Sequence, residues 1–193
     1  MRPEILNRGY APGTKMLFAM VRLFSGQPMP DAAKLVFYRP DFYGARARQF
    51  THEAMRGPSE WPVSDRELMA AYVSTVNKSA FCIGAHTATS ALAYQDQPKV
   101  AAVLADLGSA PIGEPLRATL RMLGKLTGEG TVSAADMREV LADGVSRQQV
   151  QDALAVCAAF NVTNRLADAF GFTVLSPEGF ASGAKYLLKR GYR

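Results

Sequence analysis

The sequence has few of the residues that disulfides, metal sites and cofactor sites are built from. Its 193 residues include two cysteines, Cys82 and Cys157, and two histidines, His52 and His86. Two cysteines are too few for a disulfide framework and for a structural zinc site. We therefore expect no cofactor and no metal, and we expect free cysteines in a reducing, cytoplasmic compartment.

Long hydrophobic runs are also missing. No apolar run approaches the ~18–20 residues needed to cross a bilayer. Residues 16–21 are the only apolar stretch near the N-terminus, and they are too few and start too late for a signal peptide. The apolar fraction of 48% and the charged fraction of 20% are typical of a soluble globular protein. We expect no membrane partner.

The net charge of +5 leaves room for an anionic partner, but the basic residues are scattered along the chain. A solvated surface explains such scattered charges, so a nucleic-acid partner is not expected.

The alternation of apolar and polar residues that marks strands is almost absent. Apolar residues recur instead at helical spacing, interrupted by proline, glycine and serine. These patterns predict helices over residues 14–25, 31–38, 40–56, 63–76, 80–93, 99–107, 116–127, 133–142, 146–166 and 177–188. The sequence therefore predicts a single all-α domain. It would comprise an N-terminal arm (1–39), a core (40–170) and a C-terminal helix (177–188).

A weak internal repeat suggests two similar helical units packed as one domain. Residues 64–67 align with residues 146–149, and each set opens an apolar helix with a potential capping box. Residues 108–115, rich in glycine and proline, would be the seam between the units. Only the first unit carries a thiol and an imidazole.

The candidate chemistry lies within residues 67–86. Ser79 stands where a helix N-cap is expected, which places Cys82 in the first turn, where the helix dipole favours a thiolate. His86 follows Cys82 by four positions and shares its helix face, so it can take the thiol proton. Structural roles compete with this interpretation: Cys82 as a small buried apolar residue, and Glu67 as the capping-box partner of Ser64.

The order Glu67, Ser79, Cys82 and His86 resembles the signature of the AhpD-like alkylhydroperoxidase / carboxymuconolactone decarboxylase family. In peroxidases of that family the signature is a glutamate, a Cys-x-x-Cys pair and a histidine four residues further on. Residues 160–171 also resemble the closing helix of family members, and the resemblance covers residues 40–170. It implies an all-α fold, a homo-oligomer and the thiol-dependent reduction of hydroperoxides.

By position, the resemblance makes Cys82 the peroxidatic cysteine and Glu67 and His86 a proton relay. Ser79 occupies the place of the partner cysteine, so the family's disulfide cannot form between these two positions. The resemblance therefore implies a one-cysteine peroxidase, acting on a hydroperoxide substrate and dependent on an external thiol reductant. Cys157 could resolve an oxidised Cys82 only if the fold brings the two together.

Three other interpretations stay open. The decarboxylase branch of the same family uses this scaffold for acid–base chemistry on a lactone. A non-catalytic family member is a second alternative, because Ser79 removes the cysteine pair. Residues 136–154 resemble a helix-turn-helix, but the would-be recognition helix continues as an apolar run, so DNA binding is the least favoured interpretation.

Overall fold

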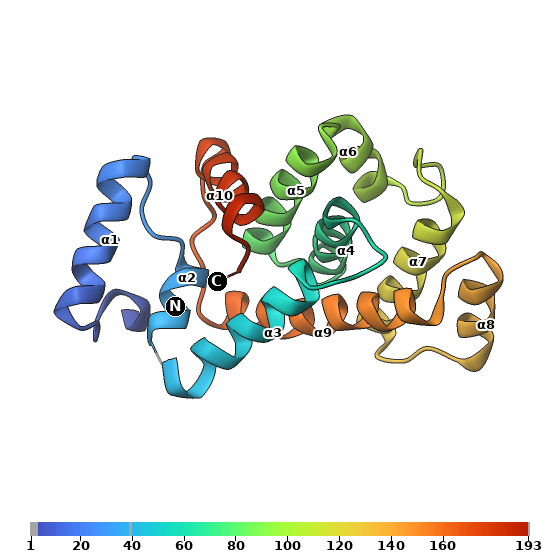
Figure 1. Ribbon diagram of the computed structural model, residues 1–193, viewed down its shortest axis with the longest axis horizontal. Coiled ribbons are helices and arrows are strands. Elements are labelled where there is room, and N and C mark those ends of the chain that lie inside the picture. Colours follow the sequence, from blue (N-terminus) through green and yellow to red (C-terminus); the bar gives the residue numbers. More distant parts are fainter. Residues whose placement is uncertain (1–3, 39, 193) are drawn as a thin grey trace.

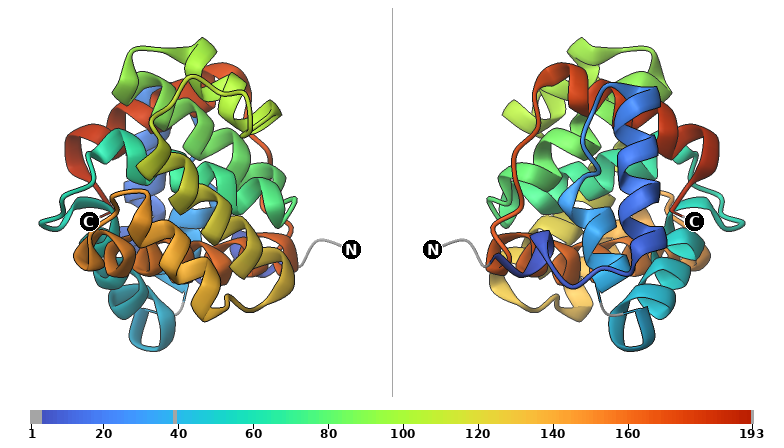
Figure 2. Two further views of the ribbon diagram at one scale, coloured as in Figure 1. Left: turned by 90° about the vertical axis from the view of Figure 1, so that its right-hand side faces the viewer. Right: turned by 90° about the vertical axis from the view of Figure 1, so that its left-hand side faces the viewer.

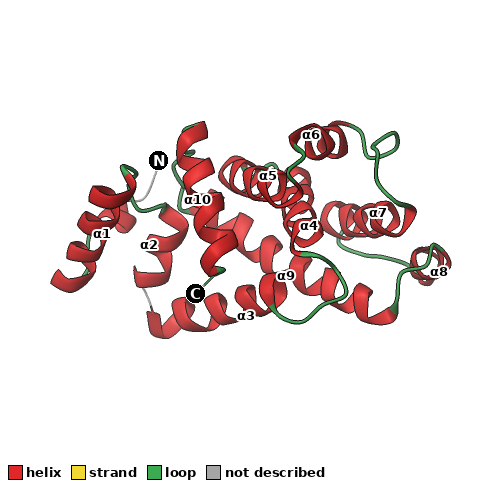
Figure 3. Ribbon diagram, turned by 45° about the horizontal axis from the view of Figure 1, so that its top comes forward, coloured by secondary structure: helices red, strands yellow, loops and turns green. Residues whose placement is uncertain are grey.

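A central pair of helices, joined by a tight turn, organises the fold. The computed structural model describes residues 4–38 and 40–192, and within them it contains helices and no strands (Figure 3). The predicted all-α fold is confirmed. The α-helices are α1 (Pro12–Ser25), α2 (Asp31–Tyr38), α3 (Ala45–Arg56), α4 (Val63–Val76), α5 (Ala80–Tyr94), α6 (Gln97–Ala105), α7 (Glu114–Glu129), α8 (Ala134–Ala142), α9 (Arg147–Ala169) and α10 (Pro177–Arg190). A 3-10 turn (Glu4–Asn7) and a π turn (Pro40–Gly44) complete them.

Helix α4 lies at the centre of the molecule and is buried around most of its circumference (Figure 1). Residues 66–71 are all buried, and α5, α7 and α9 pack against different sides of the helix. Between α4 and α5 the chain reverses at Asn77–Ser79, where Lys78 adopts a left-handed conformation with φ of 58°. This turn places α5 alongside α4, so the side chains that face each other come from the predicted signature.

Two apolar clusters fill the interior. The larger one takes side chains from α3, α4, α6, α7, α8 and α9, and it includes Phe160 and Leu120. The smaller one surrounds the start of α5, where Phe81 and Cys82 meet Leu6, Leu35 and Phe172. Cys82 therefore lies where the N-terminal arm and the chain after α9 close over α5.

Three predicted helix starts are confirmed by their caps. Ser133 and Ser146 each form a capping box at the start of α8 and α9, and Ser176 accepts from Gly179 N–H at the start of α10. The predicted capping box between Ser64 and Glu67 is wrong. Helix α4 begins at Val63, two residues before the start that a Ser64 cap would give, and it has no side-chain cap. Glu67 therefore lies in the second turn, where its carboxylate is free to point into the interior.

The two stretches aligned in the internal repeat fold differently. The first forms α4, a turn and α5, whereas the second forms α9, one continuous helix of 23 residues. The larger apolar cluster also takes side chains from both sides of the loop at 106–113, so this loop does not separate two cores. The repeat is thus a similarity of sequence and not of structure.

Helices α1 and α2 lie at one end of the molecule, and α7 and α8 lie at the other (Figures 1 and 3). Figure 2 (right) looks onto the first end, with α1 in front of the red helix α10. Helix α1 buries none of its residues. No helix among residues 4–38 and 40–192 has the length and apolar character required to cross a membrane.

The close approach of α10 to α5 depends on Gly84. A Cβ atom on Gly84 would collide with the ring of Phe180, whereas one on Gly183 would meet no atom within 4 Å. We expect Gly84→Ala to lower the free energy of unfolding by about 1–2 kcal/mol, because overpacking of about 1–3 kcal/mol exceeds the gain in helix propensity. The matched change Gly183→Ala should raise the free energy of unfolding by about 0.5–1 kcal/mol. Urea unfolding measures both, and a Gly84→Ala variant as stable as Gly183→Ala would contradict the packing.

Candidate functional site

Glu67 and His86 meet between the two central helices. Glu67 comes from α4 and His86 from α5, and Glu67 Oε2 lies 2.7 Å from His86 Nδ1. Glu67 is fully buried and His86 is 5% exposed. Glu67 and His86 lie on different helices, so their contact depends on the tight turn between α4 and α5.

The pair defines which nitrogen of His86 carries a proton. Burial raises the pKa of Glu67, but the hydrogen bond and charge of His86, followed by the charge of Arg56, outweigh it and hold the pKa below its usual value. The carboxylate is therefore ionised and only accepts hydrogen bonds, so Nδ1 of His86 must be protonated. In the neutral imidazole Nε2 is then left as the acceptor, the form that takes a proton from a thiol.

Two further residues complete the Glu67 site, and the sequence analysis missed both. Arg56 Nη2 donates to Glu67 Oε1 at 2.6 Å, and the Tyr192 hydroxyl donates to the same oxygen at 2.9 Å. The Arg56 guanidinium also lies over the Tyr192 ring, 5.2 Å from its centre. Arg56 was assigned only to the end of a helix, and Tyr192 follows the last predicted helix. Neither position carries a local signal that links it to Glu67.

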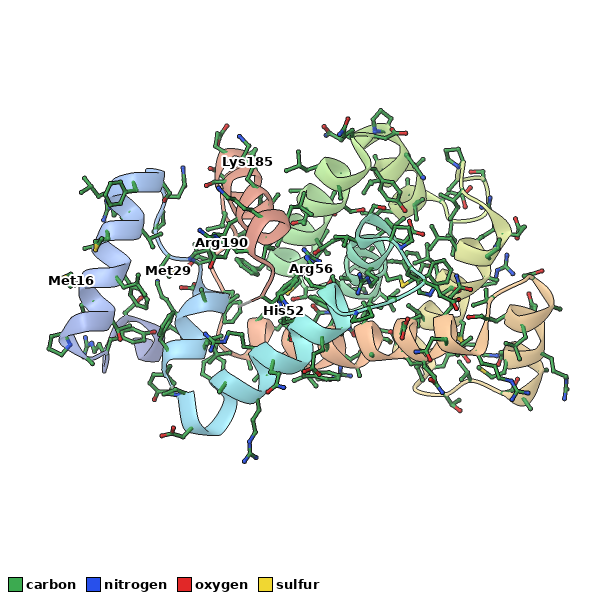
Figure 4. All side chains as sticks on the ribbon, viewed as in Figure 1. Met16, Met29, His52, Arg56, Lys185 and Arg190 are labelled. Carbon is green, nitrogen blue, oxygen red and sulfur yellow. The ribbon has the colours of Figure 1, made fainter. Side chains whose placement is uncertain are left out.

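His52 has no cysteine or acidic residue four positions away that would mark it as part of a site, but it contacts the end of the chain beside Glu67. Its Nδ1 accepts a hydrogen bond from the backbone N–H of Tyr192 at 3.2 Å. Figure 4 shows His52 and Arg56 on α3 beside the C-terminal end of α10, where Arg190 lies. His52 therefore helps to hold the end of the chain in place.

Cys82 has the predicted position but a different environment. Ser79 is the N-cap residue of α5, so Cys82 is the third residue of the helix. The Ser79 hydroxyl does not cap the helix, because it donates to Asp168 Oδ1 at 2.9 Å. No hydrogen bond joins Cys82 to His86 among the contacts of the described residues. The structure thus places the thiol one helical turn before the imidazole without a direct bond between them.

The expectation that the helix terminus would make Cys82 a thiolate does not hold in this conformation. Cys82 is 1% exposed, and burial raises the pKa of its thiol to about 12, although the nearby Ser79 side chain lowers it. The charge of Asp168 raises the pKa further. A rise to about 12 corresponds to about 4 kcal/mol in favour of the neutral thiol. A helix terminus typically contributes only about 0.3–1 kcal/mol, so desolvation decides the protonation state.

Cys157 lies in different surroundings. It contacts Thr127 and Asn161 and belongs to the larger apolar cluster, whereas Cys82 belongs to the smaller one. Both cysteines are free and buried. The structure does not bring Cys157 to Cys82 as a resolving thiol.

The helix-turn-helix interpretation is not supported by the packing. Helix α9, the would-be recognition helix, lies against α3 and α4 and buries Val150, Ala153 and Val156 in the larger apolar cluster. The apolar run of α9 is therefore part of the core, and core packing accounts for its composition without a DNA groove. The described residues also bring no group of three or more His, Cys, Asp or Glu side chains together in a way that could hold a metal ion.

Comparison with known proteins identifies the fold. No protein-family model and no curated protein sequence matches the chain. Among solved structures, a peroxidase-related protein from Silicibacter sp. TM1040 matches with a TM-score of 0.76 and 22% identity, over 90% of this chain and 91% of that one. A peroxidase-related protein from Ralstonia eutropha JMP134, described as an alkylhydroperoxidase AhpD core, matches with a TM-score of 0.73 and 22% identity, over 95% of both chains.

A third similar structure has a different activity. The debrominase Bmp8, crystallised as a cysteine-to-alanine variant with 2,3,4-tribromopyrrole, matches with a TM-score of 0.69 and 15% identity, over 93% of this chain and 91% of that one. Together these likenesses show that the chain has the AhpD-like fold that the sequence resemblance implied. They also extend the likeness beyond residues 40–170.

The buried state of Cys82 leads to a prediction for alkylation. In a Cys157→Ala background, Cys82 of the folded protein should react with iodoacetamide about 10³-fold more slowly at about pH 8 than a free cysteine, whose pKa is about 8.5. The reason is that a pKa of about 12 leaves few thiolates at this pH. Unfolding in urea should restore the ordinary rate. A rate that levels off below pH 8 in the folded protein would show a thiolate and contradict this prediction.

Replacing Glu67 by glutamine should destabilise the fold, because it leaves the charge of Arg56 buried beside a neutral amide. We expect a loss of about 3–5 kcal/mol near neutral pH. The pKa of Glu67 is lowered on folding, so its ionised form stabilises the protein above the unfolded pKa, and this stability is lost as pH falls through the lower folded pKa. The free energies of unfolding of wild type and Glu67→Gln, measured in urea, should therefore become more similar as the pH is lowered.

A matched control is the exposed Glu129 at the end of α7. Glu129→Gln should change the free energy of unfolding by about 0.5 kcal/mol or less. Equal losses for the two variants would show that the buried carboxylate has no special role in stability.

Proposed function

We propose that this protein is a thiol-dependent peroxidase that reduces hydroperoxides through Cys82, with Glu67 and His86 as its proton relay. The buried Glu67–His86 pair carries the proposal, since it lies one helical turn from the sole cysteine of the signature. A buried ion pair adds little to stability compared with apolar residues, and shifted pKa values cluster at functional sites. The AhpD-like fold, shared with peroxidase-related proteins, supports the same activity.

In the proposed reaction Nε2 of His86 takes the proton from the Cys82 thiol. The thiolate attacks one oxygen of the hydroperoxide, so that an S–O bond forms and the O–O bond breaks. The leaving oxygen takes the proton from His86 and departs as an alcohol or water, which leaves Cys82 as a sulfenic acid. Glu67 stabilises the transient imidazolium, because its carboxylate already bonds to Nδ1.

In the resting conformation the Cys82 thiol cannot carry out this reaction. Cys82 is a buried, neutral thiol, and α10 packs directly on α5 at Gly84 and Phe180. Turnover therefore begins with a displacement of α10 that opens a path to the sulfur. Hydration then removes the desolvation that raises the pKa of the thiol.

The second half of the cycle requires an external thiol. Ser79 occupies the place of a partner cysteine and bonds to Asp168, and Cys157 lies in another cluster. Two equivalents of thiol reduce the sulfenic acid to the Cys82 thiol, yielding water and a disulfide of the reductant. The homo-oligomer and the cytoplasmic location implied by the sequence stay predictions.

Acid–base chemistry on a lactone is the second candidate, and the neutral state of Cys82 favours it. The Glu67–His86 pair is assembled without help from the thiol, so it can transfer protons while Cys82 only packs. The debrominase with the same fold shows that the scaffold accommodates other substrates than peroxides.

The peroxidase proposal is tested by consumption of cumene hydroperoxide in the presence of dithiothreitol. Cys82→Ser should reduce the rate by at least about 10²-fold, because it removes the nucleophile. Wild type treated with peroxide should give one adduct with a sulfenic-acid probe, located at Cys82 by mass spectrometry. Cys157→Ser is the matched control and should keep both the rate and the adduct.

Equal rates of peroxide consumption by wild type and Cys82→Ser, with no sulfenic-acid adduct on the wild type, would contradict the peroxidase proposal. Turnover of a lactone that survives Cys82→Ser but is lost in Glu67→Gln would establish the acid–base alternative instead.

A further inference from the structure

The last residues of the chain are fixed against α3. After α10 the chain turns at Gly191, where φ is 67°, a conformation that favours glycine. A Cβ atom at Gly191 would lie 2.7 Å from the His52 ring, so only glycine allows this approach. The backbone N–H of Tyr192 then donates to His52 Nδ1 at 3.2 Å. These contacts aim the Tyr192 side chain inward, toward α4 and α5.

The Tyr192 hydroxyl reaches the centre of the candidate site. It donates to Glu67 Oε1 at 2.9 Å and lies 3.5 Å from His86 Nδ1. The rings of Tyr192 and His86 are nearly parallel, at 17°, with centres 6.4 Å apart. The edge-to-face contact of Phe160, 4.3 Å between ring centres, holds another side of the imidazole. His86 is thus held between two aromatic rings and one carboxylate.

Tyr192 supplies one of the three donors that the buried carboxylate of Glu67 receives. Oε1 accepts from Arg56 and Tyr192, and Oε2 accepts from His86. A carboxylate without solvent requires such donors to stay ionised. Burial and the charge of Glu67 raise the pKa of Tyr192 well above its usual value, so the phenol keeps its proton and remains a donor.

We infer that Tyr192 is a positioning residue of the thiol site: its hydroxyl holds the Glu67 carboxylate and thereby keeps His86 oriented with Nδ1 protonated and Nε2 available. The consequence for turnover rests on the proposed peroxidase function, whereas the effect on Glu67 and His86 does not.

The titration of Glu67 depends on few neighbours, which makes the inference testable. The charged and titratable groups facing it come from α3, from its own helix, from α5 and from the end of the chain: Arg56, Arg66, Cys82, His86 and Tyr192. The His52 ring contacts the backbone N–H of Tyr192 and not its hydroxyl. Replacement of Tyr192 by phenylalanine removes its hydrogen bond to Glu67 without a change of charge.

The test is Tyr192→Phe, which keeps the ring and removes the hydroxyl. Carboxylate ¹³C NMR should show the pKa of Glu67 raised by about one unit, because a hydrogen bond to a charged group is lost. Imidazole ¹⁵N NMR should show His86 changing from a single Nδ1-protonated tautomer to a mixture. In the peroxidase assay, the acid limb of the pH–rate profile should move to higher pH by about the same amount, with kcat reduced and KM unchanged.

The control is Tyr186→Phe, on α10, the helix that precedes Tyr192; the Tyr186 side chain is 55% exposed. It should leave the Glu67 titration and the His86 tautomer as in wild type. Tyr192→Leu removes the ring as well, and should reproduce the NMR changes if the hydroxyl is responsible.

Unchanged Glu67 and His86 signals in Tyr192→Phe would overturn the inference and leave Tyr192 as a packing residue. If these signals move while wild type consumes no peroxide, the positioning role stands and the peroxidase proposal fails. Circular dichroism of each variant confirms that it is folded in the comparison.

Discussion

The buried charge of Glu67 is the constraint on which the arrangement of this site depends. A carboxylate with no exposure to water is costly unless donors surround it, and its donors come from three separate segments of the chain. Arg56 comes from α3, His86 from α5 and Tyr192 from the end of the chain. These segments have to converge on α4 for the charge to be tolerated. The carboxylate therefore fixes the relative positions of the helices that enclose Cys82, as well as the tautomer of His86.

The helices follow from local patterns in the sequence, whereas the contacts that Arg56 and Tyr192 make with Glu67 do not. Proline, glycine and serine mark the helix ends, and the spacing of Cys82 and His86 places both on one helix, so these features were predictable. The Ser64–Glu67 capping box was wrong because α4 begins at Val63, so that Ser64 lies inside the helix and cannot be its N-cap. The contacts of Glu67 with Arg56 and Tyr192 join distant parts of the chain. Such contacts depend on how helices pack, and no periodicity within one segment encodes them.

Cys82 shows how a local motif and its tertiary setting can oppose each other. The motif places the sulfur in the first turn of α5, where the helix terminus favours a thiolate, but the arm and the chain after α9 remove water from it. Desolvation is the larger effect, so the resting thiol is neutral. The same fold occurs in peroxidase-related proteins and in a debrominase. In this chain, the covering of Cys82 decides the protonation state of its thiol.

Ser79 connects this covered state to the cycle that we propose. Its hydroxyl bonds to Asp168 and so ties the start of α5 to α9, a link that a cysteine thiol, as a weak donor, would make less well. The serine thus strengthens the frame but removes the thiol that would have resolved a sulfenic acid within the chain. In the proposed cycle, both the peroxide and the reductant then reach the same sulfur from outside. Because α10 packs directly on α5 at Gly84 and Phe180, its displacement is the step that the oxidative and reductive halves of the proposed cycle share.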